Sequence, residues 1–127
     1  MKNILLTLST IFLFNASPAL ASEDAWIPVV ATTLLENQQS PKYTDILIHN
    51  PGTYSEVKVV VGSDAIMDRF DIISFFLWGT QVSGLDGAMT AGHEYTGYFK
   101  SSKVKFVRMY VRAKNPGMPL PVHVWMR

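Results

Sequence analysis

The sequence contains no cysteine, which excludes a disulfide framework and any metal site built on cysteine ligands. Charged residues are also scarce, at 17% of the chain, whereas 48% of the residues are hydrophobic. That balance excludes an intrinsically disordered protein, because enough apolar surface is present to form a core. The 127 residues provide for one domain and are too few for two.

A long hydrophobic run is absent as well. Residues 4–14 are mostly apolar, but a helix that spans a bilayer needs about 20 apolar residues. Lys2 precedes this run, and an Ala-Leu-Ala sequence ending at Ala21 follows it with small residues at both cleavage-site positions. The pattern predicts a signal peptide over residues 1–21 and an exported domain over 22–127 that has no transmembrane segment. The competing interpretation is an uncleaved N-terminal anchor.

The exported domain has the composition of an all-β protein. β-branched and aromatic residues dominate it, and turn residues recur about every eight to twelve positions. We therefore predict a single antiparallel β-sandwich of about seven to eight strands. The strands are expected over 26–35, 43–49, 54–62, 68–77, 94–100, 103–113 and 122–127, with a short one at Gln81-Val82 and turns at 50–52, 101–102 and 114–117.

Two segments need a choice. Residues 63–78 carry apolar residues at helical spacing, yet they are rich in strand formers, and we favour a strand over a helix. In 103–113 the alternation changes phase, and a bulge near Phe106-Val107 would turn both halves of the strand toward the core. In the first strand, Pro28 favours a sheet edge. The expected core residues are Val57, Val59, Val61, Phe70, Ile72, Val107, Met109 and Val111.

Charge is segregated along the exported domain. All ten acids lie in residues 22–94, where only three basic residues accompany them, and residues 95–127 contain seven basic residues and no acid. Either the basic strands lie beside acidic ones and are neutralised, or they form a basic face for an anionic partner. The candidate residues of that face are Lys103, Lys105, Arg108 and Arg112. Because the overall charge is balanced and the domain is expected to be exported, nucleic acid is a poor partner, and we assign none.

A second candidate surface lies on the last strand. His123, Trp125 and Arg127 share the face opposite the apolar residues of that strand. An exposed tryptophan beside a cation can stack on a sugar or a peptide, so these three residues could form a ligand face. The alternative is that Trp125 covers the second sheet face or fills the core.

No motif for catalysis or for a cofactor is present. The three histidines form no short metal-binding pair, and the sequence has neither a nucleophile elbow nor a phosphate loop. Asp64, Asp68 and Asp71 lie close together but match no calcium loop. We therefore assign no catalytic residue, no metal ligand and no cofactor.

Several segments share a pattern of alternating hydrophobicity with turn glycines: Val57–Val61, Phe70–Phe75, a turn containing Gly79, Ala91-Gly92, Phe106–Val111 and Val122–Met126. In this pattern residues 57–127 resemble small exported bacterial β-sandwich domains of uncharacterised function. The resemblance implies a fold and carries over no catalytic residue. The Leu77-Trp78-Gly79 segment departs from the polar tip usual in such domains.

These observations favour a non-enzymatic binding or structural module in the periplasm or outside the cell, whose partner is an unidentified protein or an envelope polymer. One alternative is a small exported hydrolase or a hydrolase inhibitor. The other is an envelope-associated domain that binds anionic polymers through the basic strand.

The predicted cleavage site can be tested directly. N-terminal sequencing of the protein recovered after export should begin at Ser22, because cleavage follows Ala21. A recovered chain that still begins at Met1 would show that the segment is an anchor.

Overall fold

The computed structural model describes residues 25–127, so the predicted signal peptide lies outside the described residues. The described chain is nearly all β, and its one helical element is a short 3-10 turn, η1 (Glu36–Gln38). The strands are β1 (Ile27–Leu34), β2 (Thr44–Val61), β3 (Ala65–Ser74), β4 (Gly79–Gln81), β5 (Gly87–Met89), β6 (Tyr95–Ala113) and β7 (Leu120–Met126). The predicted all-β class is therefore confirmed.

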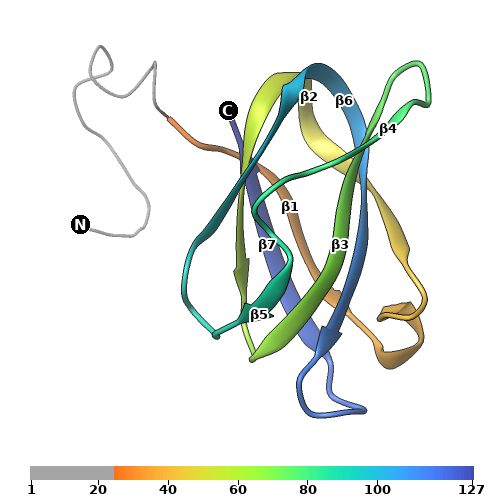
Figure 1. The fold of residues 1–127 in the computed structure, drawn as a ribbon, viewed down its shortest axis with the longest axis vertical. Helices are drawn as coiled ribbons and strands as arrows, with labels where there is room; N and C mark the ends of the chain where they lie inside the picture. Colours follow the sequence, from red (N-terminus) through yellow and green to blue (C-terminus); the bar gives the residue numbers. More distant parts are fainter. Residues whose placement is uncertain (1–24) are drawn as a thin grey trace.

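All seven strands of the described chain belong to one antiparallel sheet (Figure 1). The strand order is β1-β7-β2-β6-β3-β4, and β5 pairs with residues 65–67 of β3, while β4 pairs with residues 71–73 of the same strand. β1 lies at the edge, as Pro28 predicted, since a proline cannot donate to a neighbour on both sides. Buried residues from β1, β7, β2, β6 and β3 gather in a single core, so the sheet curves around one hydrophobic interior.

The choice of a strand over a helix for residues 63–78 is confirmed, because β3 occupies Ala65–Ser74. Its bounds are shifted toward the N-terminus relative to the prediction. Phe70 and Ile72 point into the core, and β6 and β4 or β5 flank the strand on its two sides. The apolar run after Ser74 is not part of the strand. It forms the turn between β3 and β4.

Two predicted turns are wrong. Residues 50–52 lie inside β2, and Ser101-Ser102 lies inside β6. The register explains the error, because Gly52 pairs with Val104 and Tyr54 with Ser102. The proline, glycine and serines thus mark a bend that the two strands make together, and the ladder shifts register on both sides of it.

The predicted bulge in β6 is present, one residue earlier than expected. Ile73 pairs with Phe106 and Ser74 with Val104, which leaves Lys105 as the extra residue. The bulge lets both Val104 and Val107 point inward, and both are fully buried. All eight predicted core residues are buried, none with more than 1% of its surface exposed.

Val59 offers a clean test of the core. Its side chain is fully buried, between Val124 of β7 and Tyr95 of β6. Val59→Ala should lower the free energy of unfolding by about 1–3 kcal/mol, because it removes buried methyl groups and leaves a cavity. Chemical denaturation measures the effect.

The neighbouring Val60 provides the matched control, because its side chain is on the outer face of the same strand and is half-buried. Val60→Ala should cost less than about 1 kcal/mol, mainly through lower strand propensity. Equal losses for the two variants would contradict the assigned register of β2.

Candidate functional site

The outer face of β7 carries two of the predicted ligand-face residues. Leu120, Val122, Val124 and Met126 point inward and are fully buried, so His123 and Trp125 point outward between them. His123 is exposed and Trp125 is half-buried. The structure therefore places Trp125 outside the core, on the solvent-facing side of the sheet.

Cations and rings from three segments of the chain meet on this face. The Lys58 ammonium of β2 lies 4.7 Å from the Trp125 ring centroid and 5.2 Å from that of Trp26. The His123 and Trp125 rings stack with their centroids 5.9 Å apart. The Arg127 guanidinium lies 4.2 Å from the Trp26 centroid. We call these five residues the outer aromatic cluster.

Cross-strand register explains the cluster. Trp125 pairs with Lys58 on one side and with Pro28 on the other, and paired positions in a sheet point to the same face. The Arg127 guanidinium Nε donates to the Glu56 carboxylate at 3.0 Å. This hydrogen bond is a second contact with β2, in addition to that between Trp125 and Lys58. The predicted trio is thus together in space, and it is joined by Trp26 and Lys58, whose contribution depends on strand pairing.

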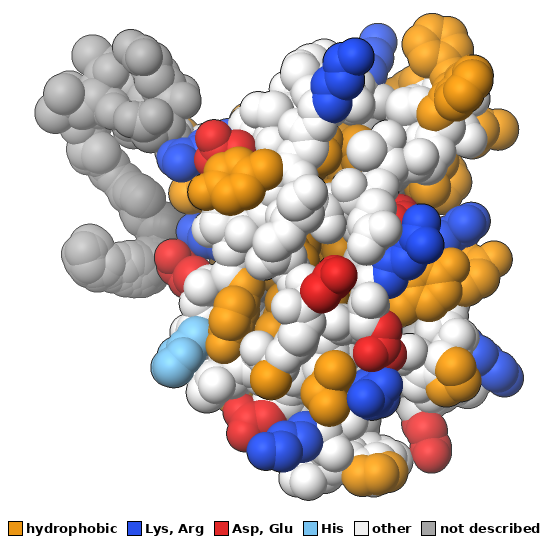
Figure 2. Space-filling model, in the orientation of Figure 1, with side chains coloured by type: hydrophobic (Ala, Val, Ile, Leu, Met, Phe, Trp, Pro, Cys, Tyr) orange, Lys and Arg blue, Asp and Glu red, His pale blue; other side chains and the backbone are white. Residues whose placement is uncertain are grey.

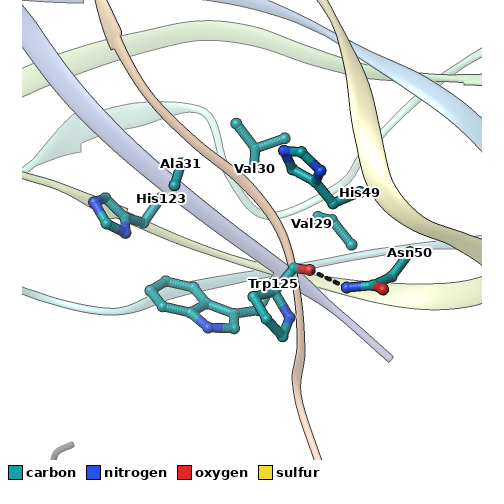
Figure 3. A pocket seen from close by; sticks show the side chains of 8 residues that line it. Val29, Val30, Ala31, His49, Asn50, His123 and Trp125 are labelled. Carbon is teal, nitrogen blue, oxygen red and sulfur yellow. Dashed lines mark hydrogen bonds between the residues drawn. The ribbon is translucent and has the colours of Figure 1, made fainter. Parts of the chain in front are cut away.

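Two hollows flank the His123–Trp125 stack. The first has a volume of about 420 Å³ and lies toward β1 and the bend in β2, where His49 and Asn50 complete its wall (Figure 3). The Asn50 side-chain amide donates to the Pro28 carbonyl at 3.0 Å and fixes this wall to β1. The second hollow, of about 500 Å³, lies toward Gly62 and Gly92.

The lining of the two hollows is mostly apolar. The first is lined by Pro28, Val29, Val30, Ala31, His49, Asn50, His123 and Trp125, and the second by Val60, Val61, Gly62, Ala91, Gly92, Pro121 and the same His–Trp pair. None of these residues is an acid, a serine or a threonine. Within residues 25–127 no group of three or more acids and histidines could hold a metal ion.

The basic strand is half neutralised. Arg108 forms a bidentate ion pair with Asp45, with N–O distances of 2.8 and 2.9 Å, and Arg112 lies 2.8 Å from an oxygen of Asp68. The hydrogen bond to Asp45 raises the pKa of Arg108, although burial opposes it. The four predicted residues therefore do not form one open basic face.

Lys103 and Lys105 have a different environment. Among the described residues, no acid lies within ion-pair distance of either lysine. The Lys103 ammonium lies instead 5.1 Å from the centroid of the Phe75 ring. The charge of this strand that has no ion-pair partner is thus concentrated near the middle of β6, at its bend.

The turn after β3 is a surface that the sequence analysis did not select. Phe75, Phe76, Leu77 and Trp78 are all exposed, with Phe76 81% and Trp78 75% accessible. We call these four residues the aromatic tip. Its signal in the sequence was the departure of Leu77-Trp78-Gly79 from a polar tip, but the same residues equally suited a buried strand end.

Hydrogen bonds hold the aromatic tip in a defined shape. The Ser74 backbone N–H donates to the Trp78 carbonyl at 3.0 Å, and the Leu77 N–H donates to the Ser74 carbonyl at 2.9 Å. Leu77 has a φ of 63°, in the left-handed region that a side chain with a Cβ adopts at a cost. The sequence thus keeps an exposed leucine where the backbone favours glycine.

Comparison of the chain with family models, curated proteins and solved structures finds no match. A search of the described residues for a helix long and apolar enough to cross a membrane also finds none.

The leucine at the tip generates a stability test. Leu77→Gly should leave the free energy of unfolding unchanged or raise it by up to about 1 kcal/mol, because relief of left-handed strain outweighs the entropy of an added glycine. Thermal and chemical denaturation measure the change. Phe76→Gly is the control, since Phe76 has no positive φ to relieve, and it should lose stability. Equal losses in both variants would contradict the strained turn.

Proposed function

We propose that the protein is an exported, non-enzymatic binding module that holds a ring-bearing ligand, such as a sugar unit of an envelope polymer, against Trp125. The observation that carries this proposal is the His123–Trp125 stack standing between two hollows on the outer face of the sheet. The exported location rests on the predicted signal peptide.

The physical basis is the amphipathic character of the tryptophan ring. A sugar ring presents C–H groups on its faces and hydroxyl groups at its edge, so an indole can cover the face while polar neighbours bond the edge. His123, His49 and Asn50 supply polar atoms around Trp125 and come from two strands. The volumes of the hollows lie in the range of small-ligand pockets.

The cations give the site a fixed form before a ligand arrives. Lys58 stacks between Trp26 and Trp125, and Arg127 joins Trp26 to Glu56. Contacts of this kind restrict the rotation of the rings, so that less conformational entropy is lost when a ligand binds. These contacts support a binding face that is already ordered in the free protein, and not one that becomes ordered only when the ligand binds.

A hydrolase is the weaker alternative. Cleavage of an ester, peptide or glycoside needs a nucleophile or a pair of carboxylates close to the bound substrate. The polar side chains that line the two hollows are those of histidines and an asparagine, and none of the lining residues is an acid, a serine or a threonine. Polymer binding through the four-residue basic strand is also weakened, because Arg108 and Arg112 are paired.

Affinity measurements with defined carbohydrates test the proposal. The exported protein is mixed with insoluble peptidoglycan, chitin and cellulose, and the bound fraction is measured after sedimentation. We expect retention on at least one polymer and a loss of about tenfold or more for Trp125→Ala, since tenfold corresponds to about 1.4 kcal/mol of stacking and burial.

Trp78→Ala is the matched control, because it removes an exposed tryptophan that lies outside the outer aromatic cluster. It should bind as the unmodified protein does. No retention on any of the three polymers, or equal retention by Trp125→Ala, would overturn the assignment. Release of soluble fragments, detected by mass spectrometry of the supernatant, would favour the hydrolase.

A further inference from the structure

The aromatic tip and the unpaired lysines of β6 lie at the same end of the molecule. The Phe75 N–H donates to the Lys103 carbonyl at 3.2 Å, and the Lys103 ammonium reaches over the Phe75 ring. Figure 1 shows the β3–β4 turn beside the bend of β2 and β6, and Figure 2 shows hydrophobic side chains gathered at that end with Lys or Arg side chains next to them. We propose that this end docks onto a lipid bilayer that carries anionic headgroups.

Exposure of the tip has no explanation within the fold. Phe76, Leu77 and Trp78 are more than half exposed, and the core is complete without them. Four consecutive large apolar residues at a turn are costly in water, because each leaves apolar surface hydrated. The presence of these four apolar residues at an exposed turn is explained if the turn inserts into the apolar part of a membrane.

The composition of the tip fits the boundary between water and hydrocarbon. Tryptophan has an apolar body and one N–H donor, and it is enriched at the level of lipid headgroups. Phenylalanine and leucine are the residues that amphipathic membrane-surface elements bury at the acyl boundary. A turn of this size reaches the interface without crossing the bilayer.

The charges beside the tip are complementary to anionic lipids. Lys103 and Lys105 lie on the segment of β6 that borders the tip, and in the described chain no acid pairs with either of them. The β6 segment itself contains no acid. Lysines at this position would contact phosphate groups while the rings enter the headgroup layer, and a neutral membrane would lack that attraction.

The backbone of the turn supports a functional origin. Leu77 is held at a positive φ by the hydrogen bonds between Ser74 and residues 77 and 78. Strained non-glycine residues are retained where the side chain itself is needed. Here that side chain is one of the exposed apolar groups of the tip.

Vesicle cosedimentation tests the proposal. The exported protein is incubated with vesicles of phosphatidylcholine alone or of phosphatidylcholine with one quarter phosphatidylglycerol. We expect binding to the anionic vesicles, a blue shift of tryptophan emission and weaker binding at high salt, because surface charge is screened. Phe76→Ser/Trp78→Ser should reduce partition by about tenfold or more, since it removes the apolar groups that insert.

Two further variants separate the contributions. Lys103→Glu should reduce binding to anionic vesicles and leave any weak binding to neutral vesicles unchanged. Leu35→Ser is the matched control, because Leu35 is an exposed apolar residue in the link from β1 to η1 and should not affect partition. Figure 1 shows the chain after β1 at the end of the molecule away from the β3–β4 turn. All variants carry the N-terminus left by export, so a difference between them reports the tip.

The outcome is independent of the carbohydrate proposal. Trp125→Ala should bind vesicles normally, and Phe76→Ser/Trp78→Ser should bind polymers normally. The membrane proposal is overturned if the unmodified protein does not sediment with anionic vesicles, or if the tip variant binds them equally well. It is also overturned if the tip instead mediates self-association, seen as a dimer in analytical ultracentrifugation that the double substitution abolishes without any effect of vesicles.

Discussion

The antiparallel pairing of β2 with β6 is the constraint on which the rest of the fold depends. The two strands have 18 and 19 residues, and they pair from one end of the domain to the other. A ladder of that length twists too far to remain flat over a compact core. The bend at Gly52 and Val104 resolves this, since both strands change direction at the same level of the ladder. β7 then pairs with one half of β2, and β3 with the other half of β6.

The same ladder determines where charge is free. The register places Asp45 opposite Arg108, so the acidic first half of the chain neutralises the basic second half across strands. At the bend the register shifts, and the bulged Lys105 has no directly opposed residue on β3. The lysines there are left to solvent, next to a turn that is also outside the regular ladder. Irregularity in the sheet thus concentrates both charge and apolar surface at one end.

Local patterns in the sequence were sufficient for the strands and the core. Val57, Val59 and Val61 alternate with a mixed face that includes Glu56 and Lys58. That period of two places the three valines on the inner face, whichever strands pair with theirs. The same logic put His123 and Trp125 on one face of the last strand, but it left open whether Trp125 is exposed or fills the core. It failed at Asn50-Pro51-Gly52, because these residues suit a bend in a continuous strand as well as a tight turn. It failed at the aromatic tip because an apolar run looks the same in a buried strand and in an exposed turn.

Lys58 and Trp26 could not be assigned to the candidate site from the sequence, since strand pairing between distant segments brings them there.

The pairing of β1 with β7 has a consequence for how the chain acquires its structure. Ile27 is opposite Met126, so the first strand and the last strand are neighbours in the sheet. A chain that emerges with its N-terminus first presents β1 long before its ladder partner exists. During that interval the strand has an unsatisfied row of backbone donors and acceptors, and the loop that must close is nearly the whole domain. Completion of the fold therefore waits for the arrival of residues 120–126, and until then the nascent chain depends on protection from aggregation.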